Sequence, residues 1–179
     1  MEETAIVNES NQQPKEKQPP LLLLGVSGLG GWLVLVQIGI YLTILLNILT
    51  LDRDTLPAFS SDTWEMLTSK DSIVYDPLWA PLLIFELVVN TLFILFGIFC
   101  LYNMYRKKSI FPKLMIIVYS SSLAVAIIDY IWLNQISIVN EYDLVGQDDV
   151  RDIIRSVITC AIWIPYFRKS ERVQNTFIR

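Results

Sequence analysis

The sequence predicts an all-α integral membrane protein, a bundle of four transmembrane helices with a short surface helix in the first outer loop. Hydrophobic residues make up 53% of the 179 residues, and charged residues make up 18%. The charges fall in short clusters, and long apolar runs separate them. Four of these runs are long enough to cross a hydrocarbon core of ~30 Å, which needs about 20 residues of helix. Because the connections alternate sides, consecutive helices are expected to be antiparallel.

The chain begins with a polar stretch, residues 1–20, that is rich in Asn, Gln, Glu, Lys and Pro. Such a composition cannot bury a core, so we expect a disordered cytoplasmic tail. Its acidic start and the lack of a small-residue cleavage site distinguish it from a secretory signal. Four glycines between Gly25 and Gly31 then interrupt helix continuity. We expect this glycine-rich segment to lie at the membrane surface or to dip shallowly into the membrane, with Trp32 at the interface.

The spans are predicted at residues 32–51, 79–102, 112–134 and 152–167, and together with their connections they form one domain, residues 21–179. On the first span, Gly39, Thr43, Asn47 and Thr50 follow one helical stripe. Small and polar residues at this spacing are typical of a contact between membrane helices. The stripe is therefore predicted to pack against a neighbouring helix.

The fourth span is the shortest, with two arginines at its start and Pro165 near its end. A proline inside a helix removes one backbone hydrogen bond, here to the carbonyl of Ala161. We therefore expect a kink at Pro165.

The connection over residues 52–77 carries six acidic residues and only two basic ones. Asp62 and Glu65 have the spacing of a capping box, and Trp64 and Leu67 can form an apolar stripe. These features predict a short amphipathic helix on the outer membrane surface. A recognition loop for a partner protein is the alternative.

The orientation follows from the distribution of basic residues near the ends of the spans. The connection between the second and third spans and the segment 168–179 are basic, whereas the other two connections are acidic. The basic parts are therefore expected to face the cytoplasm. Four spans return the chain to its starting side, so both termini are predicted to be cytoplasmic.

Ionisable and amide side chains within the spans gather at one predicted depth. Glu86 lies about 10 Å inward from Trp79 at 1.5 Å per residue. By similar counts, polar residues of all four spans reach the outer half of the membrane. The predicted cluster consists of Asn47, Glu86, Asn90, Asp129 and Arg155, with Arg151 above it at the outer rim.

Charges facing lipid are costly, by up to ~3 kcal/mol each, so we expect Arg155 to pair with Asp129, with Glu86 or with both. One interpretation is a structural network that fixes which helices meet. The other is a site for a proton, an ion or a small polar ligand. One arginine against two carboxylates leaves room for a second cation or a shared proton.

The composition argues against several classes of site. The chain has no histidine, so histidine-based catalysis and ordinary haem ligation are excluded. Cys100 and Cys160 lie in apolar runs and are expected to be structural thiols. No metal site, cofactor, nucleic-acid surface or catalytic residue is predicted, although a hydrolase using Glu86 and Asp129 stays open.

Three stretches of the chain are similar to one known family: residues 28–33 (GLGGWL), 75–86 (YDPLWAPLLIFE) and 162–173 (IWIPYFRKSERV), the last followed by Thr176 and Phe177. They resemble the bacterial membrane-protein family catalogued as domain of unknown function 2569, over about residues 25–178. The resemblance implies a multi-span protein of the bacterial cytoplasmic (inner) membrane. It brings no established activity and no functional residues.

The segment after Pro165 is expected to contact the membrane surface, with docking onto a partner protein as the alternative. In this interpretation aromatic side chains rest on the bilayer while basic ones meet anionic headgroups. The residues predicted to make such surface contacts are Trp32, Phe167, Arg168, Lys169, Arg172 and Phe177.

The preferred functional hypothesis is an accessory or scaffold membrane protein. It would act through helix packing with itself, as a homo-oligomer, or with a larger membrane-protein partner. The alternative is a small ion- or solute-transport component that uses Glu86, Asp129 and Arg155.

Overall fold

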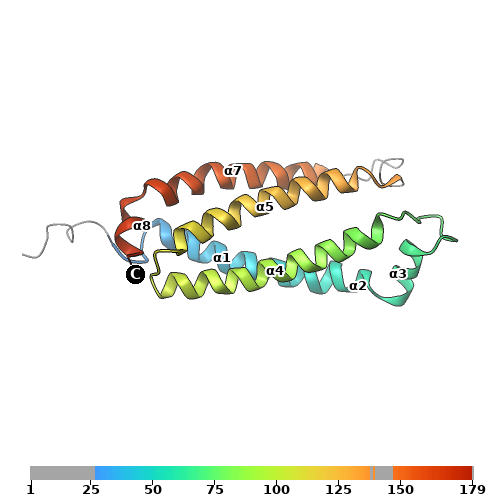
Figure 1. The fold of residues 1–179 in the computed structure, drawn as a ribbon, viewed down its shortest axis with the longest axis horizontal. Coiled ribbons are helices and arrows are strands. Elements are labelled where there is room, and N and C mark those ends of the chain that lie inside the picture. Colours follow the sequence, from blue (N-terminus) through green and yellow to red (C-terminus); the bar gives the residue numbers. More distant parts are fainter. Residues whose placement is uncertain (1–26, 138, 140–146, 179) are drawn as a thin grey trace, which may run out of the picture.

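The protein is described by a computed structural model over residues 27–137, 139 and 147–178, which contain helices and no strand. Four long helices form the body: α1 (Trp32–Thr50), α4 (Trp79–Tyr105), α5 (Phe111–Leu133) and α7 (Gln147–Lys169). They run along the long axis of the molecule, and α5 packs most extensively on α7 and α1 on α4 (Figure 1). The all-α prediction is confirmed. The predicted tail, residues 1–20, lies outside the described residues.

Within this described part, three helical segments are long and apolar enough to cross a membrane: Trp32–Ala58, Trp79–Tyr105 and Phe111–Leu133. Their lengths of 27, 27 and 23 residues correspond to about 35–40 Å of helix, more than the hydrocarbon core. Many of their large apolar side chains are exposed, as expected of side chains that face lipid. α7 is also 23 residues long, but Arg151, Asp152 and Arg155 make it more polar. A membrane protein is therefore indicated, with three spans by this measure and not clearly four.

The first helix extends beyond its predicted end at residue 51. After α1 the backbone continues through a π-helical turn, η2 (Leu51–Thr55), and a short helix, α2 (Leu56–Ala58). Asp52, Arg53 and Asp54 are exposed. Water can therefore solvate their charges, and the backbone stays helical through this segment. Thr55 is buried in this turn and lies 3.4 Å from the Asn90 amide, which donates to it. The turn thereby joins the end of the first helix to α4.

A short helix, α3 (Ser61–Thr68), lies in the connection where the sequence predicts one. It begins after Ser60, whose hydroxyl donates to that of Thr63 at 3.1 Å. Phe59 stacks on Trp64 with ring centroids 5.2 Å apart. Asp76, at the end of this connection, is buried and accepts hydrogen bonds from the amides of Leu78 and Ser137 at 2.9 and 3.0 Å. This carboxylate ties the start of α4 to the end of α5.

The C-terminal helix α8 (Glu171–Thr176) closes the opposite end of the bundle (Figure 1). Its threonine, Thr176, accepts a hydrogen bond from the amide of Gly28 at 2.9 Å. The Arg172 guanidinium lies against Gly30 and Gly31, where a Cβ atom would come within 3.2 and 3.3 Å of it. The glycine-rich segment before α1 is therefore packed against α8.

Two aromatic residues predicted to rest on the bilayer are instead part of the protein core. Phe167 and Phe177 are 3% and 5% exposed, and both pack on Phe111 with ring centroids 5.9 and 4.6 Å away. The prediction of membrane contact is wrong for these two, because α8 folds back and buries them between helix ends. Arg168 and Lys169 are exposed, as is Trp32, whose ring lies edge-on to Trp163 at 6.2 Å.

α1 and α4 make their close contact at Gly97 of α4, and not at Gly39 of the predicted α1 stripe. A Cβ atom on Gly97 would lie 2.7 Å from Cγ1 of Ile44, so only glycine allows this approach. Gly39, by contrast, has nothing within 4 Å of its Cβ position. The α1 stripe is therefore not a tight helix contact at Gly39, and two of its other members, Thr43 and Asn47, line a cavity. α7 continues through Pro165 to Lys169, two residues beyond the predicted end of the span.

Candidate functional site: a polar cavity between four helices

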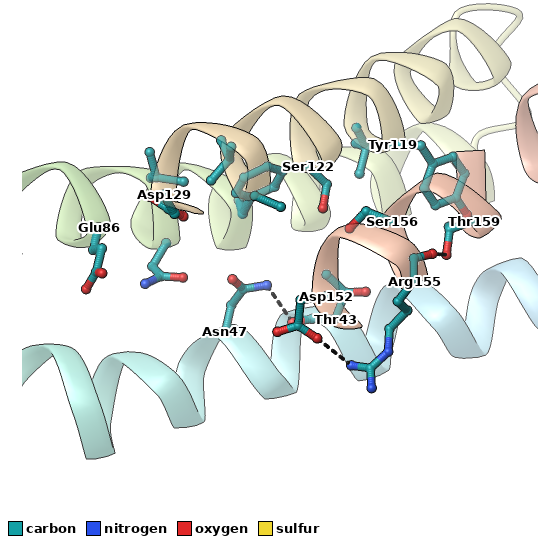
Figure 2. A pocket seen from close by; sticks show the side chains of 16 residues that line it. Thr43, Asn47, Glu86, Tyr119, Ser122, Asp129, Asp152, Arg155, Ser156 and Thr159 are labelled. Carbon is teal, nitrogen blue, oxygen red and sulfur yellow. Dashed lines mark hydrogen bonds and ion pairs between the residues drawn. The ribbon is translucent and has the colours of Figure 1, made fainter. Parts of the chain in front are cut away.

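A cavity of about 470 Å³ lies between α1, α4, α5 and α7. Figure 2 shows its side chains converging from these helices, with Glu86 and Asp129 toward one end and Tyr119 and Thr159 toward the other. Its polar lining consists of Thr43, Asn47, Glu86, Asn90, Tyr119, Ser122, Asp129, Asp152, Arg155, Ser156 and Thr159.

The structure brings five of the six predicted cluster residues to this one cavity: Asn47, Glu86, Asn90, Asp129 and Arg155. The four helices enclose a common space, and consecutive helices are antiparallel. Each helix turns one face toward this space, so the polar residues on these faces come together. Arg151 is exposed on α7, one turn before Arg155, and is not part of the lining.

The ion pair of Arg155 differs from the predicted one. Its Nη1 atom lies 3.2 Å from Oδ1 of Asp152, one turn earlier on the same helix. Among the described residues, this pair takes the place of the expected bridge to Asp129 or Glu86. The reason is geometric: the side chains of Arg155 and Asp152 are 72% and 62% exposed, and the guanidinium lies against Asp152, apart from Glu86 and Asp129 (Figure 2). The lining therefore holds three carboxyl groups and one guanidinium.

Local hydrogen bonds hold several of the polar side chains in place. The Asn47 amide donates to the carbonyl of Thr43 at 2.8 Å and leaves its oxygen on the cavity side (Figure 2). The Thr159 hydroxyl donates to the carbonyl of Arg155 at 2.8 Å. These bonds use backbone carbonyls of the same helix, so they position the side chains without bridging the helices across the cavity.

The hollow narrows toward the end of the bundle where α8 lies. A second cavity of about 170 Å³ shares Thr43, Phe93 and Thr159 with the first and continues between the same helices. Beyond it, Phe111, Phe167 and Phe177 form a packed aromatic cluster. The combined hollow is therefore polar in its wider part and is closed by apolar side chains at its narrow end.

The two cysteines take no part in a disulfide. Cys100 is buried in the core and Cys160 is partly buried. The Cys160 thiol donates to the carbonyl of Tyr119 at 3.2 Å and so links α7 to α5. Within the described residues, no group of three or more Cys, Asp and Glu side chains is arranged to hold a metal ion.

Comparison with known families places the whole helical body in one of them. The family described as "Protein of unknown function (DUF2569)" matches residues 26–178. The chain belongs to the DUF2569 family. The match confirms the resemblance seen in residues 28–33, 75–86 and 162–173, and it includes every residue of the polar cavity in this DUF2569 protein. No curated protein and no solved structure matches the chain.

Sequence reasoning did not find Tyr119 of α5, nor Asp152, Ser156 and Thr159 of α7. Together with Arg155, the three α7 residues stand at positions i, i+3, i+4 and i+7, which places them on one helical face. This stripe of polar residues could have indicated from the sequence which face of the helix lines the cavity. It was missed because Asp152 was treated as the boundary of the span and not as part of its inward face.

Proposed function

We propose that α7 crosses the membrane as a fourth span, with both ends of the helical body in the cytoplasm of a bacterial cell. The hydrogen bond between Gly28 and Thr176 supports this topology. It requires the start of α1 and the end of α7 to lie on the same side of the membrane, whereas three crossings would leave them on opposite sides. The basic residues of the α4–α5 connection and of segment 168–172 lie near this end, which favours a cytoplasmic location.

We further propose that the protein binds a small cationic solute or ion in the polar cavity, as a transport component of the membrane. The observation that carries this proposal is the cavity itself, about 470 Å³ with Glu86, Asp129 and Asp152 against a single Arg155. Carboxylates in a low-dielectric cleft attract cations and disfavour anions. In the proposed orientation the cavity lies in the outer half of the bilayer and is closed toward the cytoplasm.

The geometry favours this function over a purely structural network. A structural network would place the guanidinium between the two carboxylates and fill the space between the helices. Here Arg155 pairs with Asp152 at the exposed surface of α7, and the region beside Glu86 and Asp129 remains hollow. Ionisable residues that face a cavity within a membrane bundle are typical of pathways for ions or solutes.

An accessory role through self-association is the second candidate, and one polar group on the outside of the bundle favours it. The Gln37 amide donates to the hydroxyl of Tyr105, which lies 3.0 Å from the hydroxyl of Tyr41. Tyr41 and Tyr105 are about half exposed. Polar side chains on a lipid-facing surface are commonly contacts to another helix. If Gln37→Leu leaves the mass of the protein in nanodiscs or detergent unchanged, this role loses its support.

The binding proposal is tested on the full chain in nanodiscs of zwitterionic lipid. Na⁺, K⁺, methylammonium and tetramethylammonium are titrated into wild type, Glu86→Gln and the control Glu65→Gln, whose site on α3 lies outside the cavity. We expect at least one cation to bind, and its affinity to fall about tenfold or more in Glu86→Gln but less than twofold in Glu65→Gln. Binding of none of the four, or equal effects of the two substitutions, would refute the proposal.

A further inference from the structure

A second hollow lies on the outside of the bundle, between α4 and α5. This groove has a volume of about 500 Å³ and is almost entirely apolar. Its outward part is formed by Leu92, Leu95, Phe96, Phe99, Ile117 and Ser121. Leu92, Leu95 and Ile117 are more than half exposed. In the proposed membrane orientation these side chains lie at mid-depth in the bilayer, where they face acyl chains.

The groove and the polar cavity share a wall. Val89, Phe93 and Val125 line both hollows, two of them from α4 and one from α5. On one side of these three side chains lie the carboxyl groups of Glu86 and Asp129, and on the other side lies apolar surface. A polar site and an apolar site are therefore separated by no more than one layer of side chains.

The ends of α4 and α5 are fastened together, so the groove opens sideways and not at either end of the bundle. At one end Asp76 accepts the amide of Ser137 at 3.0 Å, and Phe85 packs on Trp132 with ring centroids 5.5 Å apart. At the other end Met104 and Cys100 of α4 share a buried core with Phe111 and Met115 of α5. Between these fastened ends, the groove runs along residues 89–99 of α4 and 117–125 of α5.

We propose that the ligand of this protein is an amphipathic cation, with a cationic head in the polar cavity and a single apolar tail that passes between Val89, Phe93 and Val125 into the α4–α5 groove. This inference rests on the proposed cation-binding function and adds the class of ligand and its lateral route. We assign a positive charge to the head of the ligand because the cavity that holds it is lined by three carboxyl groups and one guanidinium. A phospholipid is the poorer occupant, because its phosphate would face Glu86 and Asp129.

The test compares two cations that differ only in the tail, tetramethylammonium and decyltrimethylammonium, both radiolabelled. Binding to the full chain in phosphatidylcholine nanodiscs is measured by equilibrium dialysis against empty nanodiscs. Ser121→Phe fills the groove, and Ser120→Phe is the matched control, since Ser120 is exposed and lines neither hollow. Partition of the tail into lipid is the same for both variants and cancels in the comparison.

We expect decyltrimethylammonium to bind Ser121→Phe at least fivefold more weakly than Ser120→Phe, and Glu86→Gln to weaken the binding of both cations. Equal binding of the tailed cation to the two serine variants would overturn the inference. If Glu86→Gln still weakened tetramethylammonium, the proposed function would survive that result. No effect of Glu86→Gln on either cation would refute both.

A second pair of variants guards against a folding defect in Ser121→Phe. Ile117→Trp fills the same groove from one end of its α5 wall, and Ile127→Trp is its control on an exposed position outside it. The same fivefold difference is expected for the tailed cation. Equal binding by these two variants, with unchanged thermal denaturation, would overturn the inference in the same way.

Discussion

The backbone amide of Gly28 donates a hydrogen bond of 2.9 Å to the hydroxyl oxygen of Thr176, across 148 positions of the sequence. Gly28 has a φ of 97°, a conformation that favours glycine, and it precedes α1. Thr176 is the last residue of α8 and is buried. Together with Arg172 against Gly30 and Gly31, this contact links the two ends of the helical body, and the proposed four-span topology depends on it.

Replacing Thr176 by valine should destabilise the protein by about 1 to 2 kcal/mol. Valine keeps the shape of the side chain but removes the acceptor for Gly28 and the donor to the carbonyl of Arg172. Thr91→Val is the control, since its exposed hydroxyl bonds only to its own helix, at Leu87. Denaturation of both variants in detergent measures the difference, and equal stabilities would contradict the assigned contact.

Truncating Phe177 to alanine should cost about 3 to 5 kcal/mol, as for other buried aromatic residues. The ring is enclosed by the end of the bundle and lies 4.6 Å from that of Phe111. Its neighbour Ile178 is 71% exposed, so Ile178→Ala should change stability by less than about 0.5 kcal/mol. If Phe177 rested on lipid as the sequence alone suggests, the two alanine variants would be similarly stable in detergent.

Alanine at Gly97 and alanine at Gly39 should have opposite effects. At Gly97 the added methyl group meets Cγ1 of Ile44 at 2.7 Å, and overpacking of this kind costs about 1 to 3 kcal/mol. At Gly39 the space is open, and alanine favours the helix by up to about 1 kcal/mol. Thermal denaturation ranks the variants. A Gly97→Ala protein as stable as wild type would show that α1 and α4 are not held in close contact at this position.

Replacing Arg155 by alanine should change stability by less than about 0.5 kcal/mol, because its ion pair with Asp152 is exposed and local to one helix. The same substitution should raise the affinity of the cavity for a cation about twofold or more, since the lining loses its guanidinium. Denaturation and cation titration are measured on the same preparation. A large loss of stability would instead indicate that Arg155 holds the helices together.

Cysteine labelling in intact bacterial cells tests the topology. Single cysteines at Lys70, Arg106 and Lys169, all exposed positions, are introduced after Cys100 and Cys160 have been replaced by alanine. An impermeant maleimide should label position 70 directly and positions 106 and 169 only after permeabilisation. Labelling of 106 and 169 from opposite sides would mean that α7 does not cross the membrane.

Sequence patterns predicted the helices well because length and hydropathy are local properties. Trp32 and Trp79 start the first two long helices as expected, and the acidic connection contains the expected short helix. The same reasoning ended the first helix too early at residue 51, because it treated Asp52 and Asp54 as a loop. Exposed charges at a helix end do not interrupt the backbone, and the helical structure continues to Ala58.

The candidate site was only partly predictable. Counting residues along each span brought Asn47, Glu86, Asn90, Asp129 and Arg155 to one depth, and they line one cavity. The partner of Arg155 could not be found in this way, because depth along a helix does not state in which direction a flexible side chain points. The guanidinium bonds to Asp152, one turn away on its own helix.

The sequence by itself determined an all-α membrane protein, its family and the gathering of polar residues from several helices, since these follow from composition, motif and periodicity. Only the tertiary structure decided that α8 folds onto Gly28–Gly31 and buries Phe167 and Phe177. It also decided that a hollow remains beside Glu86 and Asp129. Both depend on contacts between residues far apart in the chain, because burial and empty space arise only when several helices are packed together.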